Sequence, residues 1–197
     1  MTTKIKSFVL VALLSPFSLK AQQLITMSNK CYKQVQAGNQ QNDQGQYQEA
    51  LNTFTKVLKD CSAKDAKEEG NVGKAIAFNG LKQYNDAITA AESAIKVSKQ
   101  TNVMAYYARS YALNQAGMRQ LTQGFDQLGL AYIPSYANFI SFKVADAALV
   151  NQQLLKNGVI VRPVANYEMP DYLRVSIGLF SENARFLAVL EQIVKND

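Results

Sequence analysis

The stretch "VIVRPVANYEMPDYLRVSIG", residues 159–178, contains two short runs of strand-forming residues. "VIVRPV" and "YLRVSIG" are rich in β-branched and aromatic residues, which favour strands. Each run carries one arginine, Arg162 in the first and Arg174 in the second. We therefore expect two strands, each presenting a guanidinium group, and this pair decides the fold class of the second half of the chain.

The segments around these strands predict further elements. The chain offers a helix "GMRQLTQGFDQLG" ending at Gly129, a turn at Pro134 and a strand from about Asn138. An amphipathic helix over 145–158 stops at Gly158, and a closing helix "SENARFLAVLEQIV" has Ser181 as its expected N-cap. Helix, strand, helix, strand, strand, helix is an α+β layer pattern.

The first half instead shows a helical repeat. Segments 45–58 and 82–95 carry apolar residues at three- and four-residue steps, and one follows the other by 37 positions. A third helix of the same kind is expected over 105–117, and "CSAKDAKEEG" (61–70) is expected to be a charged loop between repeats.

These segments resemble tetratricopeptide repeats, which are paired helices that stack into a groove. The matching residues of the three units are Gly45, Tyr47, Ala50, Phe54 and Val57; Ala75, Phe78, Tyr84, Ala87 and Ala94; and Ala108 and Tyr111. The resemblance implies a protein or peptide partner in the groove.

The N-terminus has the layout of a secretory signal peptide, with Lys4 and Lys6 before a short apolar run and a small residue at Ala21. We predict export to the periplasm or medium, or a cytoplasmic chain if the leader does not function. The apolar run is too short for a stable membrane anchor. The expected division is signal peptide 1–21, helical repeats 22–116 and α+β unit 117–197.

Composition excludes several kinds of chemistry. Cleavage would lower the formal net charge from +6 to about +3, and no basic patch interleaved with aromatic residues predicts nucleic-acid binding. The chain has no histidine, which rules out a Ser-His-Asp triad, a Cys-His pair and the zinc sites that need histidine. Cys31 and Cys61 are its two cysteines, and they are disulfide candidates because they lie at the two ends of one expected helical hairpin. We expect no metal and no catalytic residue.

From about Arg109 to Val194 the sequence is similar to the small domain of histidinol-phosphate aminotransferase, a fold-type I enzyme that uses pyridoxal 5′-phosphate (PLP). The residues that carry this resemblance are "LNQAGMRQLTQGFDQLGLAYIPSYANFISF", "LLKNGVIVRPVANYEMPDYLRVSIG" and "ENARFLAVL". The resemblance implies that Arg174 binds the carboxylate end of a substrate and that Arg162 helps to hold its phosphate. Glu168 departs from the family, which usually has glycine there, and its carboxylate could pair with a neighbouring arginine or disfavour an anionic ligand.

The resemblance does not extend to the PLP-binding large domain. Helical repeats occupy the space where the cofactor lysine is expected, and the nearby dipeptide Ser98-Lys99 lacks the glycines of the family motif. PLP is therefore expected only if a complementary large domain is supplied.

The preferred hypothesis is a non-catalytic, exported interaction protein on a mosaic chain. A histidinol-phosphate aminotransferase fragment that needs a large domain in trans is the alternative. The third reading leaves Arg162 and Arg174 as solvated sheet residues. In a complete enzyme the small domain packs on the large one, and the corresponding apolar surface, if the repeats leave it open, would favour a homodimer.

Overall fold

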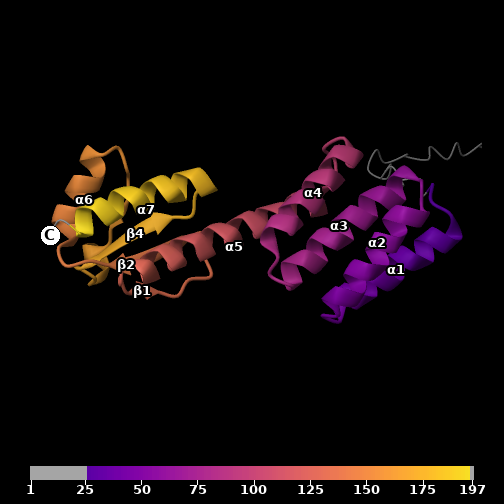
Figure 1. Cartoon of the computed structure of the whole chain (residues 1–197), viewed down its shortest axis with the longest axis horizontal. Helices are drawn as coiled ribbons and strands as arrows, with labels where there is room; N and C mark the ends of the chain where they lie inside the picture. The colour runs from indigo at the N-terminus through magenta and orange to yellow at the C-terminus, as the bar shows by residue number, and fades with distance from the viewer. Residues whose placement is uncertain (1–25, 196–197) are drawn as a thin grey trace, which may run out of the picture.

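The computed structural model describes residues 26–195, which form two lobes joined by one long helix (Figure 1). The N-terminal lobe, which we call the helical lobe, contains α1 (Asn29–Asp43), α2 (Tyr47–Asp60), α3 (Lys64–Gly80) and α4 (Tyr84–Ser98), together with the first half of α5 (Val103–Gln127). Helix α5 packs against α3 and α4 and then continues to α7 and the sheet. This arrangement confirms a mixed helical and α+β fold, whereas the assignment of the helices to tetratricopeptide repeats stays a prediction.

The C-terminal lobe, which we call the sheet lobe, is an antiparallel sheet with helices packed on one face. Its strands are β1 (Tyr132–Ile133), β2 (Phe139–Lys143), β3 (Arg162–Pro163) and β4 (Tyr172–Ser176), in the order β1-β2-β4-β3. The other elements are α6 (Ala147–Lys156), the short 3₁₀ helix η1 (Ala165–Tyr167) and α7 (Phe180–Val194). Strand alternation turns every second side chain toward the helices, which makes one face of the sheet a core face.

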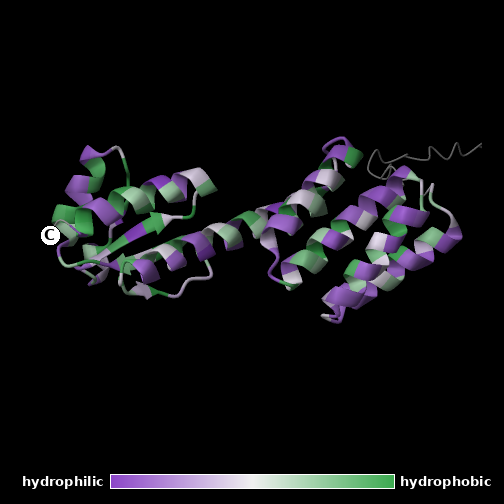
Figure 2. Ribbon diagram, viewed as in Figure 1, coloured by the Kyte–Doolittle hydropathy of each residue, from purple (hydrophilic) through white to green (hydrophobic). Residues whose placement is uncertain are grey.

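Aromatic rings fill the centre of this core. Phe125 of α5, Phe142 of β2 and Phe186 of α7 lie with ring centroids 4.9–6.1 Å apart. Leu173 and Val175 of β4 are buried in the same cluster, and Figure 2 shows hydrophobic residues on the strands and on the helices that face them. Because these apolar side chains occupy the face toward the helices, the alternating residues, including Arg174, lie on the opposite face of the sheet.

Two glycines let the first three helices approach closely. The ring of Phe54 from α2 is fully buried between Gly38 of α1 and Gly73 of α3. A Cβ atom at Gly38 would lie 2.6 Å from Phe54 Cζ, and one at Gly73 would clash with the same atom. A side chain larger than hydrogen at either position would displace the ring.

An asparagine contact links successive first helices of the lobe. Asn42 of α1 donates from Nδ2 to the carbonyl oxygen of Gly73 at 3.0 Å, and Asn79 of α3 donates to that of Ala108 on α5 at 2.9 Å. The two asparagines are 37 positions apart, which is the offset of the sequence repeat. The same contact is thus used twice in the stack.

The two helical hairpins have their open ends joined in different ways. Cys31 and Cys61 form a disulfide between the start of α1 and the residue after α2. Their counterparts 37 positions later are Glu68 and Ser98. There Asn102 donates from Nδ2 to Glu68 Oε1 at 2.6 Å, and its backbone N–H donates to Ser98 Oγ at 3.4 Å.

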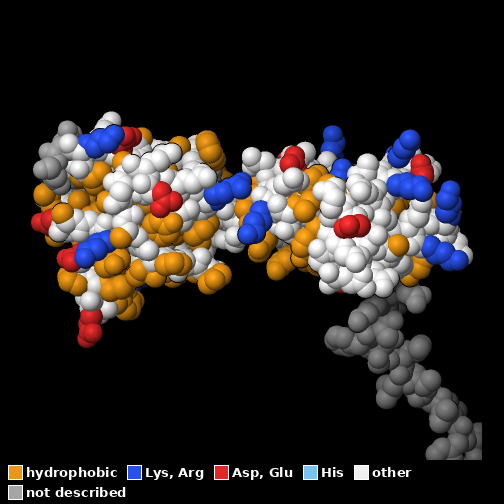
Figure 3. All heavy atoms as spheres, turned by 60° about the horizontal axis from the view of Figure 1, so that its bottom comes forward, with side chains coloured by type: hydrophobic (Ala, Val, Ile, Leu, Met, Phe, Trp, Pro, Cys, Tyr) orange, Lys and Arg blue, Asp and Glu red, His pale blue; other side chains and the backbone are white. Residues whose placement is uncertain are grey.

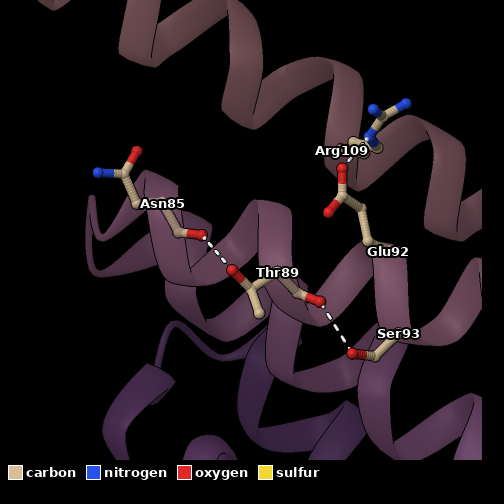
Figure 4. Close-up of polar contacts among 5 residues, drawn as sticks. All are labelled: Asn85, Thr89, Glu92, Ser93 and Arg109. Atoms are coloured by element: carbon tan, nitrogen blue, oxygen red, sulfur yellow. Dashed lines mark hydrogen bonds and ion pairs between the residues drawn. The ribbon is translucent and has the colours of Figure 1, made fainter.

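Helix α4 packs on α5 through buried alanines, and an exposed ion pair also links the two helices. Arg109 Nε lies 3.1 Å from Glu92 Oε1, and Figure 4 shows this contact between the two helices. On α4 itself, the hydroxyls of Thr89 and Ser93 each donate to the carbonyl oxygen four residues earlier, at Asn85 and Thr89. These two hydroxyls are therefore satisfied within the helix.

Three expected elements are corrected by the structure. Most of the loop expected over 61–70 is helical, because α3 begins at Lys64 and Glu68 is buried with Asn102 as its partner. The helices expected over 105–117 and 117–129 are one helix, so the expected boundary between residues 116 and 117 lies inside α5. The last helix has Leu179 and not Ser181 as its N-cap, with Glu182 Oε2 accepting from the N–H of Leu179.

The expected signal peptide, 1–21, lies outside the described residues. Within residues 26–195 there is no helix that combines the length and the apolar character needed to cross a bilayer.

Candidate anion site on the open sheet face

Arg162 and Arg174 are brought together by the pairing of β3 with β4. The two residues are direct partners in this antiparallel ladder. Directly opposite residues have Cα atoms about 4.5–5.5 Å apart and side chains on the same face. The structure therefore places both guanidinium groups on one patch of the sheet.

That patch belongs to the face that the helices leave open. On β4, Leu173 and Val175 are buried whereas Arg174 is half-buried and Ser176 is exposed. The open face carries Ile133, Phe139, Ser141, Lys143, Arg162, Tyr172, Arg174 and Ser176, all of them half-buried or exposed. The helical lobe does not cover this face.

The ring of Phe139 supports the guanidinium of Arg174. Arg174 Cζ lies 4.5 Å from the ring centroid of Phe139, and Ser141 is the residue opposite Arg174 on β2. A guanidinium stacked on an aromatic ring loses fewer rotamers when it binds a ligand. Phe139 thus orients Arg174 while leaving its N–H donors for an anion.

Neither arginine is neutralised by a carboxylate of the described residues. Across residues 26–195 the ion pairs are Arg109 with Glu92, Lys143 with Asp171, and Lys195 with Glu191. Asp171 lies 3.8 Å from Lys143 Nζ and compensates the third cation of the face. Two adjacent positive charges without a partner repel each other, and an anion between them would relieve that repulsion.

Glu168 does not form the expected ion pair with an arginine. It is exposed and has a φ of 63°, in the left-handed region. Glycine adopts this conformation without steric cost, whereas a residue with a Cβ does not. The backbone of this turn would therefore favour glycine over Glu168.

Residues that could hold PLP are not gathered in the described part of the chain. Lys99 is exposed at the C-cap of α4. Helix α5 first meets the sheet lobe at Gly117, beside Ile177, so about 20 Å of helix separate Lys99 from the strands. Lys143 is paired with Asp171. The described residues therefore do not fit PLP. They also contain no group of three His, Cys, Asp or Glu side chains that could hold a metal.

The sequence identified both arginines but not their partners. Their cross-strand pairing, the ring of Phe139 under Arg174 and the pairing of Lys143 with Asp171 all depend on strand register. Residues 139, 141 and 143 do alternate with apolar residues, which was a signal for one face, but the sequence contains no direct signal for register.

A family model described as aminotransferase class I and II matches residues 84–190. This range takes in α4, α5, the sheet, α6 and most of α7, so it starts earlier than the resemblance seen in the sequence. The C-terminal region thus resembles the small domain of histidinol-phosphate aminotransferase.

Individual relatives carry that enzyme's name. The chain is 60% identical over 123 residues to histidinol-phosphate aminotransferase of Methylobacillus flagellatus, which covers 62% of this chain and 33% of the relative. It is 57% identical over 86 residues to histidinol-phosphate aminotransferase 2 of Nitrosospira multiformis, covering 43% and 22%. The chain therefore spans a third or less of these relatives.

A solved structure of histidinol-phosphate aminotransferase from Clostridium acetobutylicum aligns with 63% of this chain and 39% of that chain. The identity is 18% and the TM-score is 0.44.

Proposed function

This chain belongs to the class I and II aminotransferases, and from that premise we propose that its open sheet face supplies the anion-binding arginines of a histidinol-phosphate aminotransferase. The cofactor-binding large domain would come from another polypeptide. The sequence patterns alone favour a non-catalytic interaction protein over this function. Family membership reverses that order.

The observation that carries the proposal is the cross-strand pair of Arg162 and Arg174. A guanidinium binds phosphate or carboxylate through two parallel N–H···O bonds and keeps its charge at every working pH. Because the two groups share one face, both can reach a single phosphate dianion. We therefore assign the phosphate of the substrate to both arginines and not to Arg162 alone.

The expected affinity for the isolated chain is modest. Bonds to charged groups contribute about 1.5–3 kcal/mol each. Two arginines on an open face would give a Kd on the order of 1 mM, which corresponds to about 4 kcal/mol.

The test is a titration of the full chain with inorganic phosphate and with histidinol phosphate, followed through the Nε–Hε resonances of the arginines by NMR. We expect the resonances of Arg162 and Arg174 to shift together with one Kd. Arg162→Gln or Arg174→Gln should weaken binding by about 10-fold or more. Arg109→Gln removes the same charge from the helical lobe, where Arg109 pairs with Glu92, and should leave binding unchanged.

Equal weakening by all three variants would attribute binding to net charge, and the proposal would be wrong. The absence of any shift at Arg162 and Arg174 up to about ten times the expected Kd would favour the reading of both as solvated sheet residues.

The helical lobe supports a second role, the binding of a protein partner between stacked helix pairs. The asparagine contacts at Asn42 and Asn79 favour this role because they recur at the 37-residue offset. We infer that α1–α4 act as two repeats of the tetratricopeptide type with α5 as the next helix.

A further inference from the structure

A groove on the helical lobe has three tyrosines among the residues that line it. Helices α1, α3 and α5 and the start of α2 enclose a cavity of about 320 Å³. Tyr47, Tyr107 and Tyr111 line it together with Ile76 and Met104. We call this cavity the tyrosine groove.

The side chains at the mouth of the tyrosine groove are exposed. The exposed fractions of Tyr107, Met104 and Tyr111 are 66%, 51% and 45%. These three side chains lie on one face of α5 at steps of three and four residues. An exposed strip of aromatic and thioether groups of this kind is typical of a binding surface and not of a solvated helix face.

The tyrosine groove has one formal charge, and it is negative. Asp43, the last residue of α1, is exposed at the groove, and none of the lining residues is a lysine or arginine. Asp43 is therefore the carboxylate that can pair with a cation in the groove.

Two polar side chains beneath the groove also turn partial negative charge toward it. Asn42 and Asn79 use their Nδ2 groups in bonds between helices. Their Oδ1 atoms are buried without a hydrogen-bond partner among the described residues. Unpaired carbonyl oxygens in a low-dielectric setting add negative potential at the surface above them.

We propose that the tyrosine groove binds an extended peptide segment and holds one of its lysine or arginine side chains between Asp43 and the tyrosine rings. The proposal rests on the partner-binding role inferred above and specifies the chemistry of the partner. The aromatic faces attract a cation, the carboxylate pairs with it, and the apolar lining accepts its hydrocarbon stem. A partner rich in acidic residues would be excluded by the same charges.

The proposal is tested with three fluorescein-labelled peptides, Ala-Leu-Ala-Xaa-Ala-Leu-Ala, in which Xaa is Lys, Met or Glu. Binding to the full chain is measured by fluorescence anisotropy at low ionic strength. We expect the Lys peptide to bind about 10-fold more tightly than the Met peptide and the Glu peptide to bind most weakly.

Two variants assign the preference to the groove. Asp43→Asn should lower the preference for Lys over Met to about twofold or less. Asp60→Asn is the matched control, because Asp60 is likewise exposed and is the last residue of α2. Both changes remove an acid from a helix C-terminus and so do not threaten folding. Tyr111→Ala, at an exposed position, should weaken the Lys peptide by about 5-fold or more.

The outcomes separate this inference from the partner-binding role. Equal binding of the Lys and Met peptides would overturn the charge preference while leaving a peptide groove. An unchanged preference in Asp43→Asn would also overturn it. The absence of binding by all three peptides would overturn both, and none of these results bears on the arginine site of the sheet.

Discussion

At the scale of single residues, strand pairing makes Arg162 and Arg174 a site. Like charges directly opposite each other in a sheet are destabilising, and no carboxylate of the described residues compensates this pair. The sheet is therefore expected to gain stability from an added anion.

Glu168 has an unfavourable backbone conformation, and we predict that Glu168→Gly stabilises the chain. The φ of 63° at this position costs a residue with a Cβ about 1 kcal/mol or more. Part of that gain is lost because glycine raises the entropy of the unfolded chain. A net increase of about 0.5 kcal/mol in the free energy of unfolding is expected from urea denaturation, whereas Glu168→Ala, which keeps the Cβ, should not stabilise. Equal stabilisation by Ala and Gly would attribute the effect to the lost charge.

The sequence alone can identify residues of this site but not their geometry. The strand-forming runs and the family resemblance select Arg162 and Arg174. Whether they lie opposite each other depends on the register of β3, a strand of two residues, Arg162 and Pro163. A shift of one residue would send Arg162 to the other face, and nothing within residues 161–178 excludes that shift.

At the scale of elements, the two hairpins show how the same geometry is held by different chemistry. The first uses Cys31 and Cys61, and the second uses Asn102 against Glu68 and Ser98. The charged run at 61–70 predicts a loop because Glu68 is expected to be solvated. Its partner lies 34 residues further along the chain, beyond the reach of local patterns.

We predict that Cys31→Ala combined with Cys61→Ala destabilises the chain. The disulfide closes a loop with a sequence separation of 30, and opening it restores about 3–4 kcal/mol of chain entropy to the unfolded state. Hydrogen exchange should quicken in α1 and α2, and if the lobes unfold together, the most protected amides of β2 and β4 should lose protection as well.

Asn102→Ala provides the comparison for the second hairpin. It leaves Glu68 buried without its partner and removes the N-cap of α5, which should cost about 2–4 kcal/mol. If exchange in α1 and α2 were unaffected by loss of the disulfide, packing around Phe54 would be sufficient to hold the hairpin.

At the scale of the whole molecule, α5 belongs to both lobes. The guanidinium of Arg119 lies 5.1 Å from the ring centroid of Tyr84 and donates to the backbone carbonyl oxygen of Lys82 at 3.5 Å. The next residue, Gln120, donates to the carbonyl oxygen of Phe180 at 3.0 Å. Figure 3 shows the narrow waist where the lobes meet. Because adjacent residues of one helix contact the two lobes, we expect the lobes to unfold together.

The continuity of α5 can be tested with Ala116→Pro. A proline inside a helix removes a backbone hydrogen bond and clashes with the carbonyl four residues earlier, here Ala112, at a cost of about 3 kcal/mol or more. We expect thermal unfolding to split from one transition into two, and small-angle scattering to show a broader range of distances between the lobes. Val103→Pro is the matched control, since Val103 is the first residue of α5 and proline is tolerated there. A single transition in Ala116→Pro would mean that contacts such as that of Tyr84 with Arg119, and not an unbroken helix, couple the two lobes.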